Sequence, residues 1–540
     1  MAEPPRYRFG PLERRGLVAG WRGGQILSVA AGLVLAVVAL RSRPTPGSIA
    51  VAVGAVLGGL FLATWPLGGR TGEEWLPTVV RWGVDGLGGS RRRRSPLPAL
   101  GHRRRASGAA LPPPVPSRAR ARSRSPFARL AVLAVTPGNG DGDLRYVAGA
   151  PSAGRVTIGV ISDGRAGTYT AILAVRGHSF ALLGPDEKDR RVAGWAGVLA
   201  SLAREGSGVH RVQWLASTIP DDGRGVRSYL ADRAAVPEDH PARRSYVALL
   251  GEAGASACRH EVHLAVQVRA GRRSRPAMGS AGGTAGACAA LLREVRSLSR
   301  RLGEIDVVVD GVLDPAQVSS LLRRTTDAEP GLHAAVNVAD GTPGSGAGAE
   351  SGGHPGGHPG NDGPAEPTDS GWPWPLTAQS EWGHLRADST FHATYWVAEW
   401  PRVDVGPDFL GPMLLGPVRR TTAVVMEPLS PSRATRQVEQ ARTADLADAE
   451  LRRRGGFLAT ARRERETELV LRRERELADG HASFRFSGYV TVTAPSADRL
   501  AEACEATEQA AGQARLDLRR LYGEQEQAFT FTLPLCRGLS

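Results

Sequence analysis

The sequence is almost free of lysine. Lys188 is the only lysine among the 68 basic residues, and the others are arginine. A nucleotide-binding P-loop ends in Gly-Lys-Ser or Gly-Lys-Thr, because its lysine reaches the β- and γ-phosphates of the nucleotide. Lys188 stands instead in the stretch DEKDR, between two acidic residues. The sequence therefore excludes a P-loop ATPase or GTPase.

Cysteine is also scarce. The 540 residues include four cysteines, and no two of them form a CxxC pair or show the spacing of a zinc-binding motif. Isolated thiols suit a reducing compartment and predict neither a disulfide framework nor a structural zinc. The four are Cys258, Cys288, Cys504 and Cys536.

Motifs for catalysis and metal binding are missing as well. In the stretch RHEVH, His260 and His263 lack the i, i+4 spacing of a zinc protease helix. The period-2 pattern of this stretch indicates a strand. The stretch NGDGDL opens like a calcium loop, but Leu144 stands where that loop needs glycine. We therefore expect no catalytic residue, no cofactor and no metal site, and we predict that the protein is not an enzyme.

One long apolar stretch dominates the amino-terminal part. Between residues 23 and 69 the only charges are Arg41 and Arg43, in the turn sequence RSRPTPG. The uncharged residues 23–40 would measure about 27 Å as a helix, which is close to the thickness of the bilayer core. A cleaved signal peptide would not need a second apolar run, and a buried soluble hairpin would carry polar residues at helical spacing. The sequence predicts a membrane hairpin within residues 1–89, with transmembrane helices at about 23–40 and 48–67.

The flanking residues predict how this hairpin lies in the membrane. Arginines precede the first span and follow the second, so the positive-inside rule places both termini in the cytoplasm, at the cell (inner) membrane. Trp21 and Trp65 stand near the ends of the spans, where indole rings anchor helices at the membrane–water interface. Everything beyond about residue 70 is then expected to be cytoplasmic.

Residues 90–129 form a basic segment rich in proline and serine. Few of its residues could join a core, which predicts a disordered linker. Two sharper hypotheses give its arginines a partner, either anionic lipid or the phosphates of DNA. The arginines in question are Arg91, Arg92, Arg93, Arg94, Arg103, Arg104 and Arg105.

The remaining sequence predicts two α+β domains, at 130–336 and 372–540, joined by a Gly- and Pro-rich linker at 337–371. The second domain contains a long, densely charged helical region, which we expect to be two exposed helices or a protruding helical hairpin. Two short apolar runs are predicted to be strands, FALL at 180–183 and AFTFTLPLC at 528–536. The fold class is thus a membrane α-helical hairpin of two transmembrane helices plus cytoplasmic α+β domains.

Several segments resemble known families. The stretch YRFGPLERRGLVAGWRGGQ, the two-span hairpin and EEWLPTVVRW together resemble actinobacterial integral membrane proteins of conjugation-type gene clusters. The hairpin resembles the small PrgI-like inner-membrane components of type IV secretion systems. The later segments GTYTAILAVRG, ATYWVAEWPR, FLATARR and FRFSGYVTVTAP are similar to the amino-terminal, non-ATPase domain of the conjugation ATPase.

The resemblance implies a non-catalytic inner-membrane scaffold of a type IV secretion-like translocation apparatus. A separate P-loop ATPase and other channel subunits would be its partners, and the protein could form homo-oligomers. Two alternatives stay open, a membrane component of a type VII secretion system and a membrane-associated factor that binds DNA through the arginine-rich linker.

Overall fold

The computed structural model describes most of the chain outside the segments of low sequence complexity. The described residues are 23–42, 45–67, 70–87, 91–94, 125–127, 130–135, 157–177, 180–220, 226, 229–230, 233, 236–254, 258–270, 284–327, 374–375, 377–455 and 461–539.

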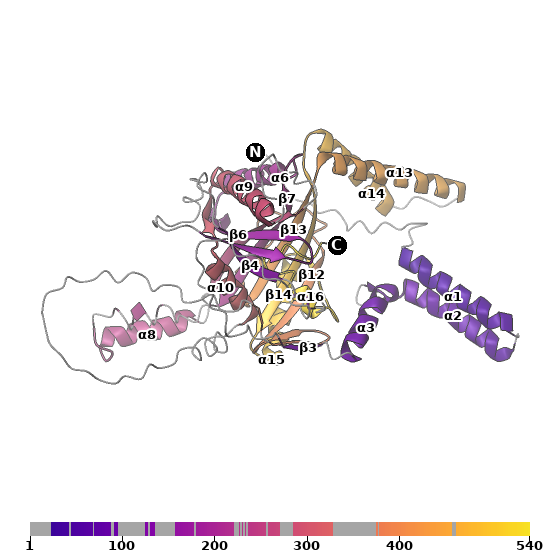
Figure 1. Cartoon of the computed structure of the whole chain (residues 1–540), viewed down its shortest axis with the longest axis horizontal. Helices are drawn as coiled ribbons and strands as arrows, with labels where there is room; N and C mark the ends of the chain where they lie inside the picture. The colour runs from indigo at the N-terminus through magenta and orange to yellow at the C-terminus, as the bar shows by residue number, and fades with distance from the viewer. Residues whose placement is uncertain are drawn as a thin grey trace.

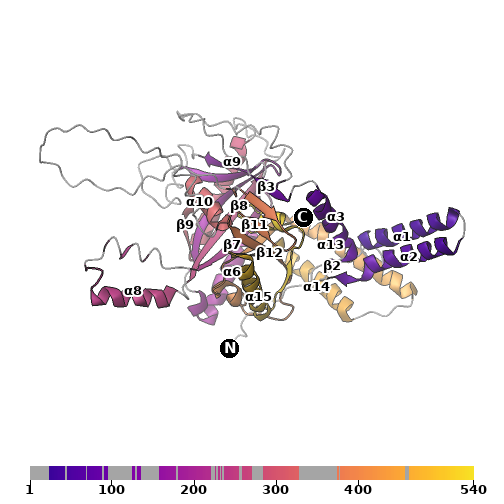
Figure 2. The same cartoon turned by 90° about the horizontal axis from the view of Figure 1, so that it is seen from below.

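Two apolar helices form an antiparallel pair that stands out from the body (Figures 1 and 2). Helices α1 (Gly23–Ser42) and α2 (Pro46–Thr64) are long and apolar enough to cross a membrane. Thr45 caps α2, since its hydroxyl accepts from the Ser48 amide and the Ser48 side chain accepts from the Thr45 amide. The predicted helical hairpin is confirmed in this coarse sense.

The body is built around one antiparallel sheet of 13 strands. Both predicted α+β segments contribute strands, and they meet where β7 (Val209–Pro220) pairs with β13 (Arg420–Leu429). The strand order is β3-β10-β11-β12-β14-β13-β7-β8-β6-β5-β4, with β9 beside β6 and β15 beside β12. The other strands are β3 (Arg92–Arg94), β4 (Leu130–Val135), β5 (Ile158–Asp163), β6 (Thr168–Gly177), β8 (Cys258–Arg269), β9 (Val307–Val312), β10 (Thr377–Ser380), β11 (Leu385–Ala387), β12 (Thr390–Glu399), β14 (Ser483–Ala494) and β15 (Asp517–Arg520).

The sheet consists of two halves that repeat one topology. In the first half, β6 pairs with β5 and β9 along one edge and with β8 along the other, and β8 pairs with β7. In the second half, β12 pairs with β11 and β15 along one edge and with β14 along the other, and β14 pairs with β13. Strands β4 and β10 add to β5 and β11 in the same way.

The register of the strands repeats as well. Leu173 on β6 pairs with Leu264 on β8, and the equivalent Tyr395 on β12 pairs with Val490 on β14. A register shift interrupts the pairing of β6 with β9, and another interrupts the pairing of β12 with β15. Leu264 on β8 pairs in turn with the central strand β7, and Val490 on β14 pairs with the central strand β13.

On the central strands, these partners are Trp214 on β7 and Thr422 on β13, which are therefore equivalent. Across the centre Trp214 pairs with Val424, and Thr422 pairs with Ala216. Trp214 is equivalent to Thr422, and Ala216 is equivalent to Val424, so exchanging the two halves converts one pair into the other. A pseudo-two-fold axis therefore passes between β7 and β13.

Helices follow the strands in the same order in both halves. In the first half they are α6 (Pro185–Leu202), α8 (Pro241–Gly254), α9 (Thr284–Gly303) and α10 (Pro315–Thr326). In the second half they are α12 (Gly411–Leu415), α13 (Pro431–Gly455), α14 (Ala461–Ala478), α15 (Ala497–Gln513) and α16 (Gln525–Phe529). Helices α6 and α9 pack in a core cluster with strands of the first half, and α12 and α15 pack in another with β12 and β14. A further core cluster joins the two halves, since it contains Ile172 on β6 and Leu385 on β11.

The predicted charged region is a helical hairpin. Helices α13 and α14 pack against each other, and Arg442 on α13 contacts Glu474 on α14 at 2.8 Å between Nη1 and Oε1. The pair α13–α14 joins β13 to β14, and α8 lies between β7 and β8 at the equivalent place in the other half. In Figure 1 α8 and α13–α14 extend from opposite ends of the body.

Two predicted strands are wrong. Residues 180–182 form a single 3-10 turn, η1 (Phe180–Leu182), which leads into α6. The run AFTFTLPLC ends helix α16 and continues as turns, although its alternation of apolar and polar residues is typical of a strand. Side chains on β7 and β8 bind the backbone of this run, since Gln213 donates to the Phe531 carbonyl and Gln267 donates to the Leu535 carbonyl.

Candidate functional site

The candidate functional site is the junction between the α1–α2 pair and the sheet. Small residues bring the two helices together, since a Cβ at Gly32 would lie 2.6 Å from the Ala55 carbonyl oxygen and one at Gly59 would lie 2.8 Å from that of Ser28. Close approach at small residues is the usual way in which membrane helices pack.

At the base of the pair, the Gln25 amide donates to the Ala63 carbonyl at 2.7 Å. Most large side chains of α1 and α2 are exposed, Leu27 by 71% and Val37 by 64%.

A tight reversal connects the helical pair to α3 (Gly72–Leu87). Strands β1 (Pro66–Leu67) and β2 (Arg70–Thr71) pair with each other, and Gly72 then packs directly on α2. A Cβ at Gly72 would lie 2.9 Å from Cδ2 of Leu62 and 3.1 Å from its Cα. The first turn of α3 therefore lies against the last turn of α2.

Aromatic rings fasten α3 to the body. Trp382, in the turn between β10 and β11, stacks on Trp75 at 5.8 Å and meets Trp82 edge-on at 5.1 Å between ring centroids. Tyr522, just after β15, completes the group at 6.3 Å from Trp382. These four rings form the aromatic clamp, which joins α3 to the second half of the sheet.

The predicted linker is wrong at its start. Residues 92–94 form strand β3, which pairs with β10, and Arg91 lies over the Trp82 ring at 3.3 Å and donates to the Trp82 carbonyl at 2.7 Å. Four arginines in a row suggested a solvated segment, but backbone pairing and a cation–π contact order their first residues.

The other predicted site residues are placed as follows. Arg92 is exposed, and Arg93 and Arg94 take part in β3 through their backbone. Trp65 is 55% exposed and stacks on Phe61 at 5.3 Å, at the end of α2. Trp21, Arg103, Arg104 and Arg105 lie outside the described residues.

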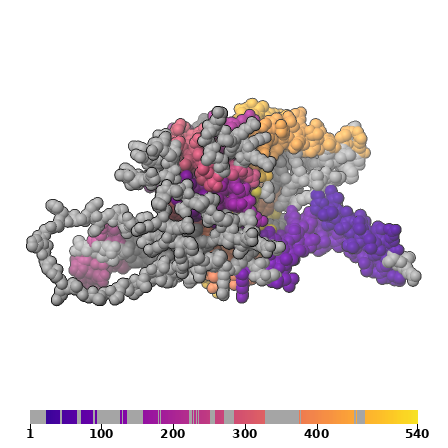
Figure 3. Space-filling view, viewed as in Figure 1, coloured from indigo at the N-terminus to yellow at the C-terminus, as the bar shows by residue number. Residues whose placement is uncertain are grey.

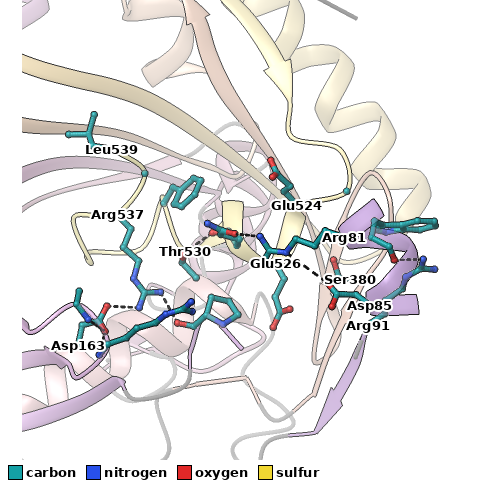
Figure 4. A pocket seen from close by; sticks show the side chains of 18 of the residues that line it. Arg81, Asp85, Arg91, Asp163, Ser380, Glu524, Glu526, Thr530, Arg537 and Leu539 are labelled. Carbon is teal, nitrogen blue, oxygen red and sulfur yellow. Dashed lines mark hydrogen bonds and ion pairs between the residues drawn. The ribbon is translucent and has the colours of Figure 1, made fainter. Parts of the chain in front are cut away.

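A polar cavity of about 440 Å³ opens beside α3 (Figure 4). It lies between α3, the turn after β5 and residues 523–539, and its lining contains arginines and acidic residues. Arg537 binds Asp163 at 2.6 Å and donates to the Pro126 carbonyl at 2.7 Å. Arg81, on α3, reaches the Gln527 side chain at 3.2 Å. None of the described lining residues is histidine or cysteine.

Arg211 also lines this cavity. It donates to the carbonyls of Cys536 and Leu539 and pairs with Glu427 at 2.9 Å. Burial would raise the pKa of Glu427, but the hydrogen bonds and charges of Arg211 and Arg485 outweigh it and lower that pKa. Arg211 therefore holds the end of the segment 530–539 against the sheet, and Glu427 and Arg485 support it. This role is structural.

Two buried titratable groups among the described residues have strongly shifted pKa values. Burial lowers the pKa of His392 to about 3 and raises the pKa of the Cys536 thiol. The His392 ring therefore stays neutral, and the Cys536 side chain stays a protonated thiol. In the part of the chain that the structure describes, no three His, Cys, Asp or Glu side chains form a group that could hold a metal ion.

Comparisons with known proteins assign no relative. No protein-family model matches the chain, and no curated protein matches it.

The sequence could not reveal the aromatic clamp. Its rings come from α3, from the turn before β11 and from residue 522, which are far apart along the chain. The density of tryptophan in residues 372–400 is a signal in the sequence, but it does not distinguish an ordinary core from a contact with α3.

Proposed function

We propose that this protein is a membrane-anchored scaffold of a conjugation or type IV secretion-like translocation apparatus, and that a separate P-loop ATPase docks on its cytoplasmic body. The observation that carries the proposal is the α1–α2 pair, whose apolar side chains are exposed to the surroundings of the molecule. Exposed aliphatic surface of this length costs free energy in water and is stable in lipid.

The proposed orientation has both termini in the cytoplasm and the turn at residues 43–45 outside. It rests on the flanking arginines, because positively charged segments stay on the cytoplasmic side. A cysteine introduced at Thr45 should react with a membrane-impermeant maleimide added to intact cells. A cysteine in place of Leu446, which is 65% exposed on α13, should react only after lysis.

The proposed docking surface for the ATPase is the α13–α14 hairpin. It is exposed along most of its length and carries arginine and glutamate side chains of both signs, such as Arg472 and Glu476. Charged, protruding surfaces of this kind promote electrostatic association with a complementary partner.

The test is affinity purification of the tagged chain from detergent-solubilised native membranes, with identification of its partners by mass spectrometry. A P-loop ATPase together with conjugation-type channel subunits is the expected result. Replacing residues 434–477 with a short Gly-Ser turn should remove the ATPase. Replacing residues 241–254 in α8, at the equivalent place in the other half, is the matched control and should retain it.

Other outcomes would overturn the proposal. Recovery of the chain from the soluble fraction would contradict the membrane anchor. Recovery with nucleic acid and without a membrane partner would instead support DNA binding, which should then weaken steeply with salt. Components of a type VII system among the partners would reassign the apparatus.

A further inference from the structure

Helix α3 has two apolar faces, and the body covers only one of them. The inner face carries Trp75, Thr78 and Trp82, of which Thr78 is buried and the two rings belong to the aromatic clamp. The outer face carries five exposed aliphatic side chains, from Val79 at 47% to Leu87 at 93% exposure. We name this outer face the aliphatic stripe. Its residues are Leu76, Val79, Val80, Val84 and Leu87.

The aliphatic stripe is continuous. Residues 76, 80, 84 and 87 follow one another at intervals of three or four residues, which places them on one side of the helix. Val79 widens the stripe beside Val80, and Gly83 lies between Val80 and Val84. The charges in the second half of the helix lie off the stripe, because Arg81 contacts Gln527 and lies 3.9 Å from Asp85. A soluble protein rarely exposes such a stripe without a partner.

The position of α3 identifies that partner as lipid. Gly72 packs on Leu62, so the stripe begins within one turn of the place where α2 ends. In Figures 1 and 2 α3 runs across the direction of α1 and α2. On the face shown in Figure 3, the arm formed by these helices projects from the body. A helix that starts where a membrane span ends and runs across it lies along the membrane surface.

We propose that α3 is an interfacial helix, with its aliphatic stripe embedded among the lipid headgroups and upper acyl chains of the inner leaflet. Helices of this kind bury their apolar face about 5–10 Å into that boundary. The proposal rests on the membrane hairpin of the proposed function. It adds that the body is held at a defined orientation, because the aromatic clamp fixes the opposite face of α3 to the sheet.

The experiment places a fluorescent reporter at single positions of the full chain. Cys258 is the only half-buried cysteine and is replaced by serine, while the other three are buried. The environment-sensitive dye NBD is then attached to a cysteine introduced at Val80, and separately at Val84, Leu446 or Val53. The purified chain is reconstituted into vesicles of phosphatidylcholine and phosphatidylglycerol.

We expect blue-shifted emission at Val80 and Val84, together with strong quenching by lipids that carry a nitroxide near the headgroup. Leu446, exposed on α13, is the control and should show neither effect. Val53, exposed near the middle of α2, reports on the hairpin and should be quenched best by a nitroxide deep in the acyl chains.

Each other result has a definite meaning. Quenching at Val53 but not at Val80 or Val84 would overturn the interfacial helix and keep the membrane hairpin. Blue-shifted but unquenched emission at Val80 would also overturn it, because a protein surface and not lipid would then cover the stripe. Absence of quenching at all positions, Val53 included, would overturn the hairpin and the interfacial helix together.

Discussion

Single residues show where the fold depends on an uncharged interior. His392 is fully buried on β12, where Nε2 donates to the Thr326 carbonyl at 3.1 Å and Nδ1 accepts from the Thr493 hydroxyl at 3.0 Å. This pattern needs a neutral ring with its proton on Nε2. Protonating Nδ1 would place a charge in a fully buried site and remove an acceptor.

Acid should therefore destabilise the protein through this residue. Burial lowers the pKa of His392 to about 3, below the usual value near 6.5, so the unfolded chain binds the proton first. The stabilisation is complete above pH 6.5 and is lost as the pH falls from 6.5 towards 3, by about 2 kcal/mol at pH 5. Thermal unfolding between pH 7.5 and pH 5 measures this slope, which should be smaller in His392→Gln.

His481→Gln, at an exposed position, is the control and should keep the slope of the parent. His210, His263 and His384 also have pKa values lowered by burial, so His392→Gln should retain part of the slope. Equal slopes in the parent and in His392→Gln would contradict the prediction.

Two adjacent glycines in α2 make a matched pair of tests for the packing of the helical pair. Gly59→Ala would place a methyl group 2.8 Å from the Ser28 carbonyl oxygen, whereas a methyl group at Gly58 meets nothing within 4 Å. Overpacking of this kind costs about 1–3 kcal/mol. We expect Gly59→Ala, but not Gly58→Ala, to separate α1 from α2 at lower SDS concentration.

Energy transfer between dyes at Val37 and Val51 measures that separation, since both positions are exposed near the turn of the pair. An equal response of the two alanine variants would show that the close contact at Gly59 is unimportant.

At the scale of elements, local signals in the sequence predicted helices well where a cap was present. Asp314 followed by Pro315 is typical of a helix start, and α10 begins there, with a capping box between Asp314 and Gln317 and proline in the first turn. The charged hairpin was also predicted, because glycines separate two helical stretches. These elements depend on interactions within a few residues, which a sequence displays directly.

Elements that depend on distant partners were missed. The alternation of Phe529 to Thr532 is typical of a strand, but the amides of residues 530–532 donate to carbonyls three residues earlier, and the Gln213 side chain on β7 donates to the Phe531 carbonyl. Strand β3 exists because β10 lies beside it, almost 300 residues later in the chain. No periodicity in residues 91–94 could have indicated that pairing.

The aromatic clamp should control whether α3 stays attached to the body. Trp382 contacts the other three rings of the clamp, so Trp382→Ala removes the centre of the group. Trp382 is half-buried, so its loss should cost only part of the about 3–5 kcal/mol that removal of a fully buried tryptophan costs. Hydrogen exchange of residues 72–94 should accelerate in this variant.

Trp195→Ala is the matched control, because Trp195 packs in the core of the first half. It should accelerate exchange in α6 and β6 and leave residues 72–94 unchanged. Equal acceleration of residues 72–94 by both variants would indicate general destabilisation and no specific clamp.

At the scale of the whole molecule, one sheet joins segments that composition separates. The low-complexity stretch at 337–371 is the basis for predicting two domains joined by a linker. Strands β7 and β13 pair over seven residues of each strand, from Arg420 with Thr218 to Met426 with Val212. Long-range antiparallel pairing of this kind leaves no local pattern.

The two halves should therefore unfold together. Residues 530–539 bind strands of the first half through Gln213 and Gln267, and they follow directly on the second half. Calorimetry of the detergent-solubilised chain should give one transition for the body, and exchange at β6 and β12 should rise at the same denaturant concentration. Two separate transitions would show that the halves are independent domains.

The pseudo-two-fold axis between β7 and β13 has an evolutionary consequence. The pairing of Trp214 with Val424 and of Thr422 with Ala216 is the register that two identical chains would adopt if their β7 edges met across a symmetry axis. Duplication and fusion of such a homodimer preserve the shared sheet and free each copy to diverge. The two halves differ at this point, since α8 stands between β7 and β8 in one half, and α13–α14 stand between β13 and β14 in the other.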